Sequence, residues 1–401
     1  MVKARSGNFL FYFILLDLVI LPVTRFYGLS ISLLICLYYV FTKKGSNKYW
    51  LAKYFLFLVV LSTAIGLFTK TQTVILQNIS SYSILDSHIE DIKRCAYLLF
   101  AYFYFRTVRI IVSDHQIEKK ALHQFIWIYV ALFLLLYGVK IINPQGYYVL
   151  RNMLYGQDIS MGFTNELIAS GYYSRYSFVF LDPNSSGYIS MALIILMIEY
   201  TCKRERIIYY LLLALIPVLT LSTGNIFALG IYFLVKLISK RKNLTHSKRS
   251  IYTIAVIAVA AAFLLVQQSA FVQNIAVIDR MENNSMSGRF AIYADIFNKL
   301  KLPIIGQGYV IAQEGNYVRP HSDHLRILYG YGILAYLCAL KIILNKKLLT
   351  SKYYFLIPIW IAFTINSAID EIRILFLLSS VIGFLVGQET TIPEEQRSHI
   401  S

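Results

Sequence analysis

RPHSDHLRILYGYGILAYLCALK, residues 319–341, places a cluster of charged side chains directly before an apolar run. The run is long enough to cross a bilayer as a helix, and we expect a membrane span at 323–341. Ionisable groups at the edge of such a span are costly to place and usually functional. The stretch therefore predicts a membrane helix with a functional site at one end.

The composition of the whole chain points to the same class of protein. Apolar residues make up 57% of its 401 residues and charged residues only 15%. A soluble protein of this size could not bury so much apolar surface, so we expect an all-α polytopic membrane protein. The formal charge of +17 is then explained by basic cytoplasmic loops. It indicates membrane lipids rather than nucleic acid as partners. The four cysteines are scattered singly and predict neither a disulfide nor a zinc site.

The hydrophobic pattern divides the chain into about twelve candidate spans within one integral membrane domain, 1–401. These spans are 9–24, 27–41, 50–68, 95–112, 122–142, 187–201, 207–222, 224–238, 251–267, 323–341, 353–368 and 372–387. Every second loop between them is rich in Lys and Arg, as is the segment before the first span. Because cytoplasmic loops carry the positive charge, both termini are predicted to be cytoplasmic.

Three outer loops are long: 69–94, 143–186 and 268–321. Long loops that are not of low complexity are usually functional. Loop 143–186 combines many tyrosines with Arg151 and Arg175, which suits stacking on sugar rings and binding of phosphate oxygens. An aromatic belt at the membrane interface explains the tyrosines equally well.

Loop 268–321 contains the pattern of a short amphipathic helix. Its apolar positions are spaced as on one helical face from Phe290 to Leu300, and Ser287 is a candidate N-cap. Arg289 lies in the first turn, where a guanidinium and free backbone N–H groups together form an anion site. Pro303 and the run 306–308 are predicted to end this helix in a flexible turn.

Four segments in a fixed order make the chain similar to the superfamily of O-antigen polymerases and O-antigen ligases. They comprise an Arg followed by Asp-Pro-Asn, a Ser-Thr-Gly turn, an Arg with an amphipathic helix and Gly-x-Gly, and a His-Ser-x-x-Leu-x-x-Leu-x-x-x-Gly pattern. In this chain they are residues 175–184, 221–224, 287–308 and 321–332. One position departs from the pattern: relatives often carry Arg after the Ser-Thr-Gly turn, where this chain has Asn225. Either Asn225 makes the polar contact itself, or Arg175 or Arg151 supplies the charge.

The resemblance implies a glycosyltransferase of the bacterial inner membrane without metal or cofactor. Its substrate would be an undecaprenyl-diphosphate-linked glycan, transferred to a sugar hydroxyl at the periplasmic face. Arginine binds phosphate with forked donors, and the unperturbed pKa of histidine lies near neutrality. We therefore predict His321 as the general base or as the residue that orients the acceptor, and Arg289 as the second catalytic residue. Substrate contacts are predicted at Arg319, Arg175, Asp323, His324, Asn184 and Arg151.

Other ionisable residues receive simpler interpretations. His321 and His324 lack a third ligand and make a poor metal site. Glu90 and Asp91 are read as a solvated loop pair, and Asp17 has no evident partner. Three arginines of the fourth span either snorkel to the headgroups or line a cavity for the lipid diphosphate: Arg94, Arg106 and Arg109.

Among superfamily activities we favour an O-antigen polymerase, because the His-Ser-Asp and Asp-Pro-Asn segments resemble polymerases more closely. The alternatives are an O-antigen ligase, which would use lipid A–core as acceptor, and a flippase for the lipid-linked glycan. A chain-length regulator protein is a candidate partner of a polymerase. Specificity for the repeat unit is expected to reside in 143–186 and 268–320.

Overall fold

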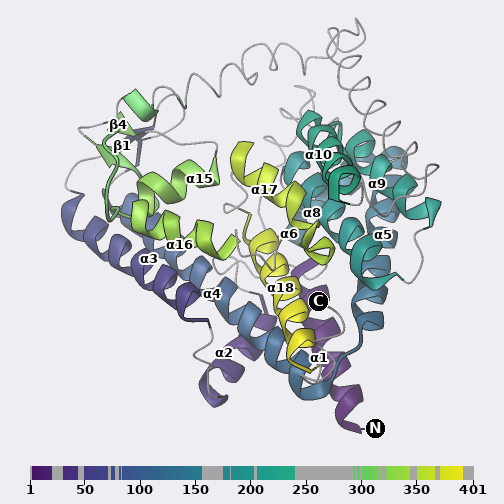
Figure 1. Ribbon diagram of the computed structural model, residues 1–401. Helices are drawn as coiled ribbons and strands as arrows, with labels where there is room; N and C mark the ends of the chain where they lie inside the picture. Colours follow the sequence, from purple (N-terminus) through teal and green to yellow (C-terminus); the bar gives the residue numbers. More distant parts are fainter. Residues whose placement is uncertain are drawn as a thin grey trace, which may run out of the picture. The chain divides into compact units, whose positions relative to one another are not determined.

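The computed structural model describes residues 2–19, 30–43, 49–70, 74–76, 81–82, 84–155, 175–180, 182–202, 206–239, 293, 296–298, 300–313, 316–317, 322–343, 350–365 and 371–391. The chain forms two compact units. Figure 1 labels their helices and strands. Unit 1 comprises Met1–Phe125, Asp295–Asn345 and Ile369–Ser401, and unit 2 comprises Ile126–Ala294 and Lys346–Ala368.

Unit 1 is built around two long helices, α4 (Ile84–His115) and α18 (Ile372–Thr391). Their backbones approach closely because Gly383 and Gly387 of α18 face the carbonyl oxygens of Phe105 and Arg109 in α4. Small residues allow such close packing of membrane helices. Around this pair lie α1 (Val2–Val19), α2 (Ser32–Thr42) and α3 (Trp50–Thr69). The short helix α15 (Asp323–Arg326) continues into a π-helical turn, η4 (Ile327–Tyr331), and α16 (Ile333–Ile343) follows after Gly332.

Unit 2 is built around α8 (Pro183–Leu196), which is buried on all sides and continues as a π-helix, η3 (Met197–Thr201). A helix without a polar face belongs in the interior, and α8 indeed packs against α9, α10 and α17. The other elements are α5 (Lys119–Ile142), which begins in unit 1, α6 (Pro144–Tyr155), α9 (Ile207–Thr220), α10 (Thr223–Ser239), the 3-10 turn η6 (Ser351–Tyr353) and α17 (Leu356–Ile365).

The helices confirm the predicted class of polytopic membrane protein. Four are long and apolar enough to cross a membrane: Trp50–Thr69, Ile84–His115, Lys119–Ile142 and Ile372–Glu389. Five shorter apolar helices accompany them, Gly7–Val19, Ser32–Thr42, Ile207–Thr220, Gly224–Ser239 and Ile333–Ile342. Helix occupies every predicted span inside the described ranges, whereas the predicted span 251–267 lies outside them.

Two predicted outer loops of unit 1 meet in a small sheet that the hydrophobic pattern does not indicate. Its strands are β1 (Val74–Leu76), β2 (Ser81–Tyr82), β3 (Ala312–Gln313) and β4 (Asn316–Tyr317), in the order β2-β1-β4-β3. β1 and β4 are parallel, with Ile75 opposite Asn316. Strands of two or three residues are too short for an alternating pattern to reveal them. The sheet ties loop 69–94 to loop 268–321.

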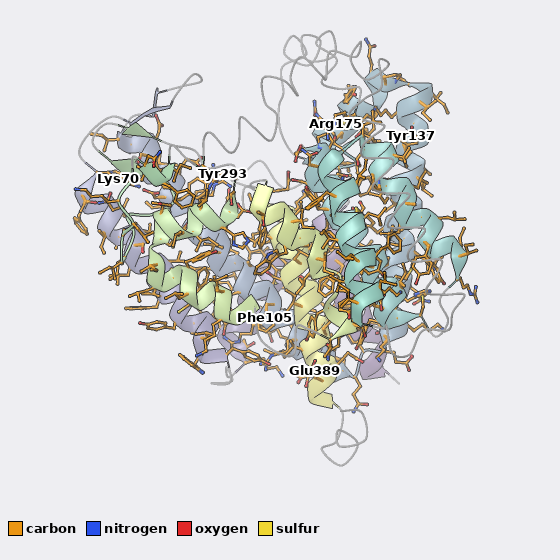
Figure 2. The ribbon with its side chains drawn as sticks, turned by 45° about the horizontal axis from the view of Figure 1, so that its top comes forward. Lys70, Phe105, Tyr137, Arg175, Tyr293 and Glu389 are labelled. Atoms are coloured by element: carbon orange, nitrogen blue, oxygen red, sulfur yellow. The ribbon has the colours of Figure 1, made fainter. Side chains whose placement is uncertain are left out.

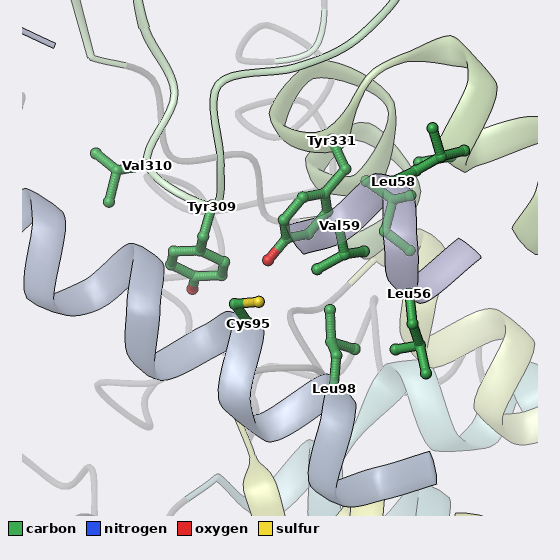
Figure 3. Close-up of a cluster of buried hydrophobic side chains, with 10 residues drawn as sticks. Leu56, Leu58, Val59, Cys95, Leu98, Tyr309, Val310 and Tyr331 are labelled. Carbon is green, nitrogen blue, oxygen red and sulfur yellow. The ribbon is translucent and has the colours of Figure 1, made fainter. Parts of the chain in front are cut away.

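Unit 1 also contains a hydrophobic cluster of side chains from its helices and from Tyr309 and Val310 (Figure 3). Side chains of α3, α4, η4 and α16 surround Tyr309 and Val310, which follow the Gly306–Gly308 run. The cluster contains Leu56, Leu58, Val59, Cys95, Leu98, Tyr309, Val310, Ile327, Tyr331 and Ala335. The segment before α15 is therefore part of the packed interior.

Candidate functional site

The predicted site residues fall into two described groups, one in each unit. Arg151, Arg175 and Asn184 lie in unit 2, and Asp323 and His324 lie in unit 1. His321, Arg289 and Arg319 lie outside the described residues, as does the start of the predicted amphipathic helix. Helix is present at Tyr293 and 296–298, within the expected range of that helix.

The group in unit 2 is centred on the side chain of Asn184 (Arg175 is labelled in Figure 2). Its Oδ1 accepts a hydrogen bond from Arg175 Nη2 at 2.6 Å and another from Ser222 Oγ at 2.7 Å. Two of the four sequence segments, 175–184 and 221–224, are therefore in direct contact. Arg175 also donates through Nε to the carbonyl of Thr220 at 3.2 Å, so one guanidinium spans both segments.

Local rules explain why Asn184 is presented in this way. Asp182 is the N-cap of α8, where its carboxylate accepts from Ser185 N at 3.0 Å and Ser185 Oγ at 3.1 Å. Pro183 occupies the first helical position, which suits its fixed φ and missing N–H. Asn184 follows in the first turn and donates through Nδ2 to Asp182 Oδ1 at 3.2 Å. The Asp-Pro-Asn sequence is thus a helix start that orients its own asparagine.

The turn after α9 completes this group. Leu221 has a φ of +46°, the left-handed conformation that ends α9, and Ser222 follows directly. Asn225 is fully buried; its backbone N lies 3.3 Å from Ser222 Oγ, and its Nδ2 donates to Thr220 Oγ1 at 3.0 Å. It packs so tightly on Gly187 of α8 that no Cβ would fit there. Asn225 therefore stabilises the turn through its hydrogen bonds, and the guanidinium of Arg175 supplies the positive charge beside the turn.

Arg151 of α6 is buried beside the same segment. Its Nη1 donates to Ser177 Oγ at 3.1 Å, and its guanidinium lies 5.4 Å from the ring centroid of Tyr148. Tyr147 donates to the carbonyl of Phe178 at 2.9 Å, and burial raises the pKa of Tyr147 to about 12. Three tyrosines of this loop, Tyr147, Tyr148 and Tyr176, are buried. They act here in packing, neither as an exposed sugar platform nor as an interfacial belt.

The group in unit 1 follows the His-Ser motif. Ser322 is the N-cap of α15 and accepts from Leu325 N at 3.5 Å; Asp323 and Arg326 behind it are buried. The Arg326 guanidinium lies 4.5 Å from the ring centroid of Tyr309 and donates to its hydroxyl. Arg94 of α4 approaches the same ring, at 4.9 Å. Two guanidinium groups therefore converge on one buried tyrosine next to the motif.

Residues 208–340 match the model of a family described as O-antigen ligase. The match supports the similarity of the chain to the superfamily of O-antigen polymerases and ligases. The matched region contains three of the four sequence segments and ends before the last helices; the Arg175–Asn184 segment precedes it. No curated protein matches the chain. The protein is accordingly a bacterial inner-membrane protein with a glycosyltransferase-like activity, polymerase or ligase, on lipid-linked glycans.

Asp91 differs from the prediction, which placed it in a solvated loop pair with Glu90. Asp91 is fully buried and forms an ion pair with Lys70, so it is not part of a solvated loop pair. Its Oδ1 also accepts from Val310 N at 2.8 Å. Burial lowers the pKa of Lys70 from its ordinary value, and the charge of Asp91 opposes that shift. The sequence held one signal for this ion pair: residues of opposite charge, Lys70 and Asp91, lie near the two ends of the predicted loop 69–94.

Other ionisable side chains also find partners in unit 1. Asp17 accepts from Ser32 N at 2.6 Å, at the start of α2. Arg106 donates to the carbonyl of Lys43, and the Arg109 guanidinium lies 4.9 Å from the ring centroid of Tyr49. These two contacts fit snorkelling toward the end of the span better than a diphosphate cavity.

The Gly306–Gly308 run is not the flexible turn that the sequence indicates. Its backbone is hydrogen-bonded, with Gly308 N donating to Gly330 O at 2.9 Å, and Pro303 just before the run accepts from Ile333 N at 3.0 Å. Glycine is required for close backbone contact here rather than for mobility. Within the described ranges, no three His, Cys, Asp or Glu side chains are grouped to hold a metal ion.

Proposed function

We propose that the protein is an O-antigen polymerase that joins undecaprenyl-diphosphate-linked repeat units at the periplasmic face of the inner membrane. In this reaction a hydroxyl of the acceptor unit attacks the anomeric carbon of the donor glycan. The bond from that carbon to the diphosphate breaks, and undecaprenyl diphosphate leaves with the electron pair. The acceptor hydroxyl loses its proton to a base.

The observation that carries the proposal is the contact of Arg175 with Asn184 and with the turn before Ser222. The Asp-Pro-Asn segment resembles polymerases, and its asparagine holds a guanidinium beside the turn that belongs to the matched region. A guanidinium keeps its charge at every physiological pH and binds phosphate with two parallel hydrogen bonds. Arg175 is thereby suited to hold the diphosphate.

The remaining roles rest on the sequence. His321 is the general base for the acceptor hydroxyl, and Arg289 and Arg319 complete the binding of the diphosphate or glycan. The cap at Ser322 supports this role, because it fixes the backbone that follows His321 directly. Asp323 and His324 orient the site, and Arg151 is a further candidate contact. Arginines supply the positive charge, so the reaction needs neither metal nor nucleotide.

The second candidate function is that of an O-antigen ligase, with lipid A–core sugar as acceptor. The description of the matching family favours it. Both reactions use the same donor and leaving group, and only the acceptor differs. A flippase would not require the sequence segments of a transferase, and the family match argues against it.

The experiment is a lipopolysaccharide gel of a strain lacking this gene, beside the complemented strain. Core with a single repeat unit means that flipping and ligation still work and supports the polymerase. Bare core with undecaprenyl-linked polymer accumulating in the periplasm supports the ligase. Bare core without such polymer supports the flippase.

Complementation with His321→Ala and with Arg289→Ala then tests the catalytic residues. Both variants are expected to insert normally and to restore no polymer. Lys43→Ala is the control, since Lys43 is exposed and paired with Asp114 at 3.2 Å. A normal ladder from either well-expressed site variant would remove that residue from the catalytic set.

A further inference from the structure

The Gly306–Gly308 run of unit 1 is held on two sides by backbone contacts. On one side, Gly308 N donates to Gly330 O, and Gly306 lies so close to that carbonyl that no Cβ would fit. On the other side, Gly66 of α3 faces the carbonyl of Gln307 with the same lack of space. The run therefore has little freedom to shift, because neighbouring backbones fill the space around it.

Asp91 fixes the end of this run. Its Oδ1 accepts the Val310 N–H at 2.8 Å, and its carboxylate lies directly against Gly308, where a Cβ would be 2.8 Å from Oδ1. Its other oxygen, Oδ2, pairs with Lys70. The exposed fractions of the two side chains are 2% for Lys70 and 0% for Asp91. Desolvation of the two charges offsets most of their attraction, so net stability alone does not account for a buried ion pair at this position.

Tyr309 lies between the two residues that Asp91 holds. With Gly308 and Val310 fixed, the direction of the Tyr309 side chain is fixed too, and it meets the Arg326 guanidinium at 4.5 Å. Figure 3 shows Tyr309 beside Tyr331 over α4. Arg326 belongs to the first turn of α15, where its N donates to Ser322 O at 3.0 Å. A continuous set of contacts thus runs from Asp91 to the residue after His321.

The sheet ties the other end of the same connection. Lys70 is followed by β1, and β1 pairs in parallel with β4, which precedes the His321 segment. The chain between Val310 and Ser322 is consequently anchored at Asp91, at β1 and at the cap of α15.

We propose that Asp91, supported by Lys70, is a positioning residue for glycan transfer. By holding Val310 it keeps Tyr309 against Arg326 and fixes the start of α15, whose N-cap Ser322 directly follows His321 in the sequence. This inference rests on the proposed role of His321. Asp91 holds Val310 through its hydrogen-bond acceptor Oδ1. Lys70 is needed only to balance the negative charge of the buried carboxylate.

Two double variants separate the acceptor from the charge, because both remove the buried ion pair. Lys70→Met with Asp91→Asn keeps an amide oxygen for Val310 N–H. Lys70→Met with Asp91→Leu removes the acceptor and leaves an apolar pair, which buried sites tolerate well. The control is Lys43→Met with Asp114→Asn, which neutralises an exposed pair elsewhere in the unit.

The measurements are kcat and KM for purified lipid-linked repeat unit, the unfolding temperature, and hydrogen exchange of peptides covering 303–311. We expect the Asn double variant to stay within about threefold of the unmodified protein. The Leu double variant should unfold at a similar temperature and keep its KM. Its kcat should fall about tenfold to a hundredfold, since small misplacements of reacting groups cost this much, and its 303–311 peptides should exchange faster.

Equal kcat for the two double variants would overturn the inference. If both variants were as active as the unmodified protein, the pair would be purely structural, and if both lost activity, it would act through its charge. If only the Leu double variant unfolds, Lys70→Met with Asp91→Ser takes its place in the same comparison of kcat. The shorter serine side chain moves the acceptor away from Val310 N–H. Transfer by the unmodified protein to lipid A–core instead of to a second repeat unit would contradict the polymerase. The same kcat comparison would then be made in the ligase assay, so the two failures are distinguishable.

Discussion

At the scale of single residues, one amide oxygen joins two distant parts of the sequence. Asn184 Oδ1 accepts from Arg175 and from Ser222, which lie in separate segments. Carboxylate oxygens accept from the same donors, whereas a methyl group does not. The identity of residue 184 therefore controls the placement of Arg175.

The corresponding prediction concerns Asn184→Ala and Asn184→Asp. The alanine variant should lose at least tenfold in polymer formation and about 1–3 kcal/mol in stability, because partly buried donors lose their acceptor. The aspartate variant retains the acceptor for Arg175 and Ser222 but loses the donor to Asp182, so it should keep more activity than the alanine variant. Polymer is quantified on gels at matched expression, and stability is followed by thermal unfolding in detergent. Equal activity of the two variants would contradict the role given to the acceptor.

A second prediction at this scale concerns Asn225, where relatives often carry Arg. Asn225 is fully buried against Gly187, so Asn225→Arg should overpack the α8–α10 contact and destabilise the protein by about 1–3 kcal/mol. Asn225→Ser, which is smaller, should be tolerated better. The comparison uses the fraction of monodisperse protein and the unfolding temperature. A stable, more active Arg variant would show that this turn accepts the side chain of its relatives.

At the scale of elements, glycines decide how the segment before α15 packs. Gly308 has a φ of +96°, a conformation that side chains with a Cβ rarely adopt, and it contacts the Asp91 carboxylate. Gly332, with a φ of +91°, similarly separates η4 from α16. These two positions join irregular backbone to regular helix inside unit 1.

Gly308→Ala should therefore destabilise the protein by about 1–3 kcal/mol and reduce polymer formation strongly. The matched control is Gly138→Ala in α5, where a new Cβ would have no atom within 4 Å. Alanine favours helix over glycine, so the control should be neutral or slightly stabilising. Thermal unfolding and gel ladders of both variants provide the test, and similar losses in both would refute the argument from Gly308.

At the scale of the whole molecule, the membrane determines which arrangement of the chain is acceptable. Apolar helices satisfy their backbone hydrogen bonds internally, and basic loops stay in the cytoplasm. From the basic loops we predict that both termini and loop 240–249 are cytoplasmic and that loop 69–94 is periplasmic.

Cysteine labelling in intact cells tests this topology. In a background without the four native cysteines, Asn78→Cys should react with a membrane-impermeant maleimide. Asn243→Cys should react only after the cells are permeabilised. The reverse pattern would invert the predicted orientation and place the site on the side of the nucleotides.

The sequence alone determined the class of the protein and the approximate position of its spans, although the helix predicted from 187 begins at Pro183 and the one predicted from 95 begins at Ile84. Long apolar runs must become helices in lipid, and the caps Asp182 and Ser322 act within three residues of their own position. These features depend on neighbours in the chain, and so they are readable from it.

Only the tertiary structure decided which of these segments meet. Asp91 binds Lys70 and Val310, Asn184 binds Ser222, and β1 pairs with β4, although long stretches of chain separate the partners. A buried carboxylate and a solvated one look alike in a sequence, because burial depends on packing between helices. The same packing turned the glycine run into a fixed segment and placed Tyr309 against Arg326.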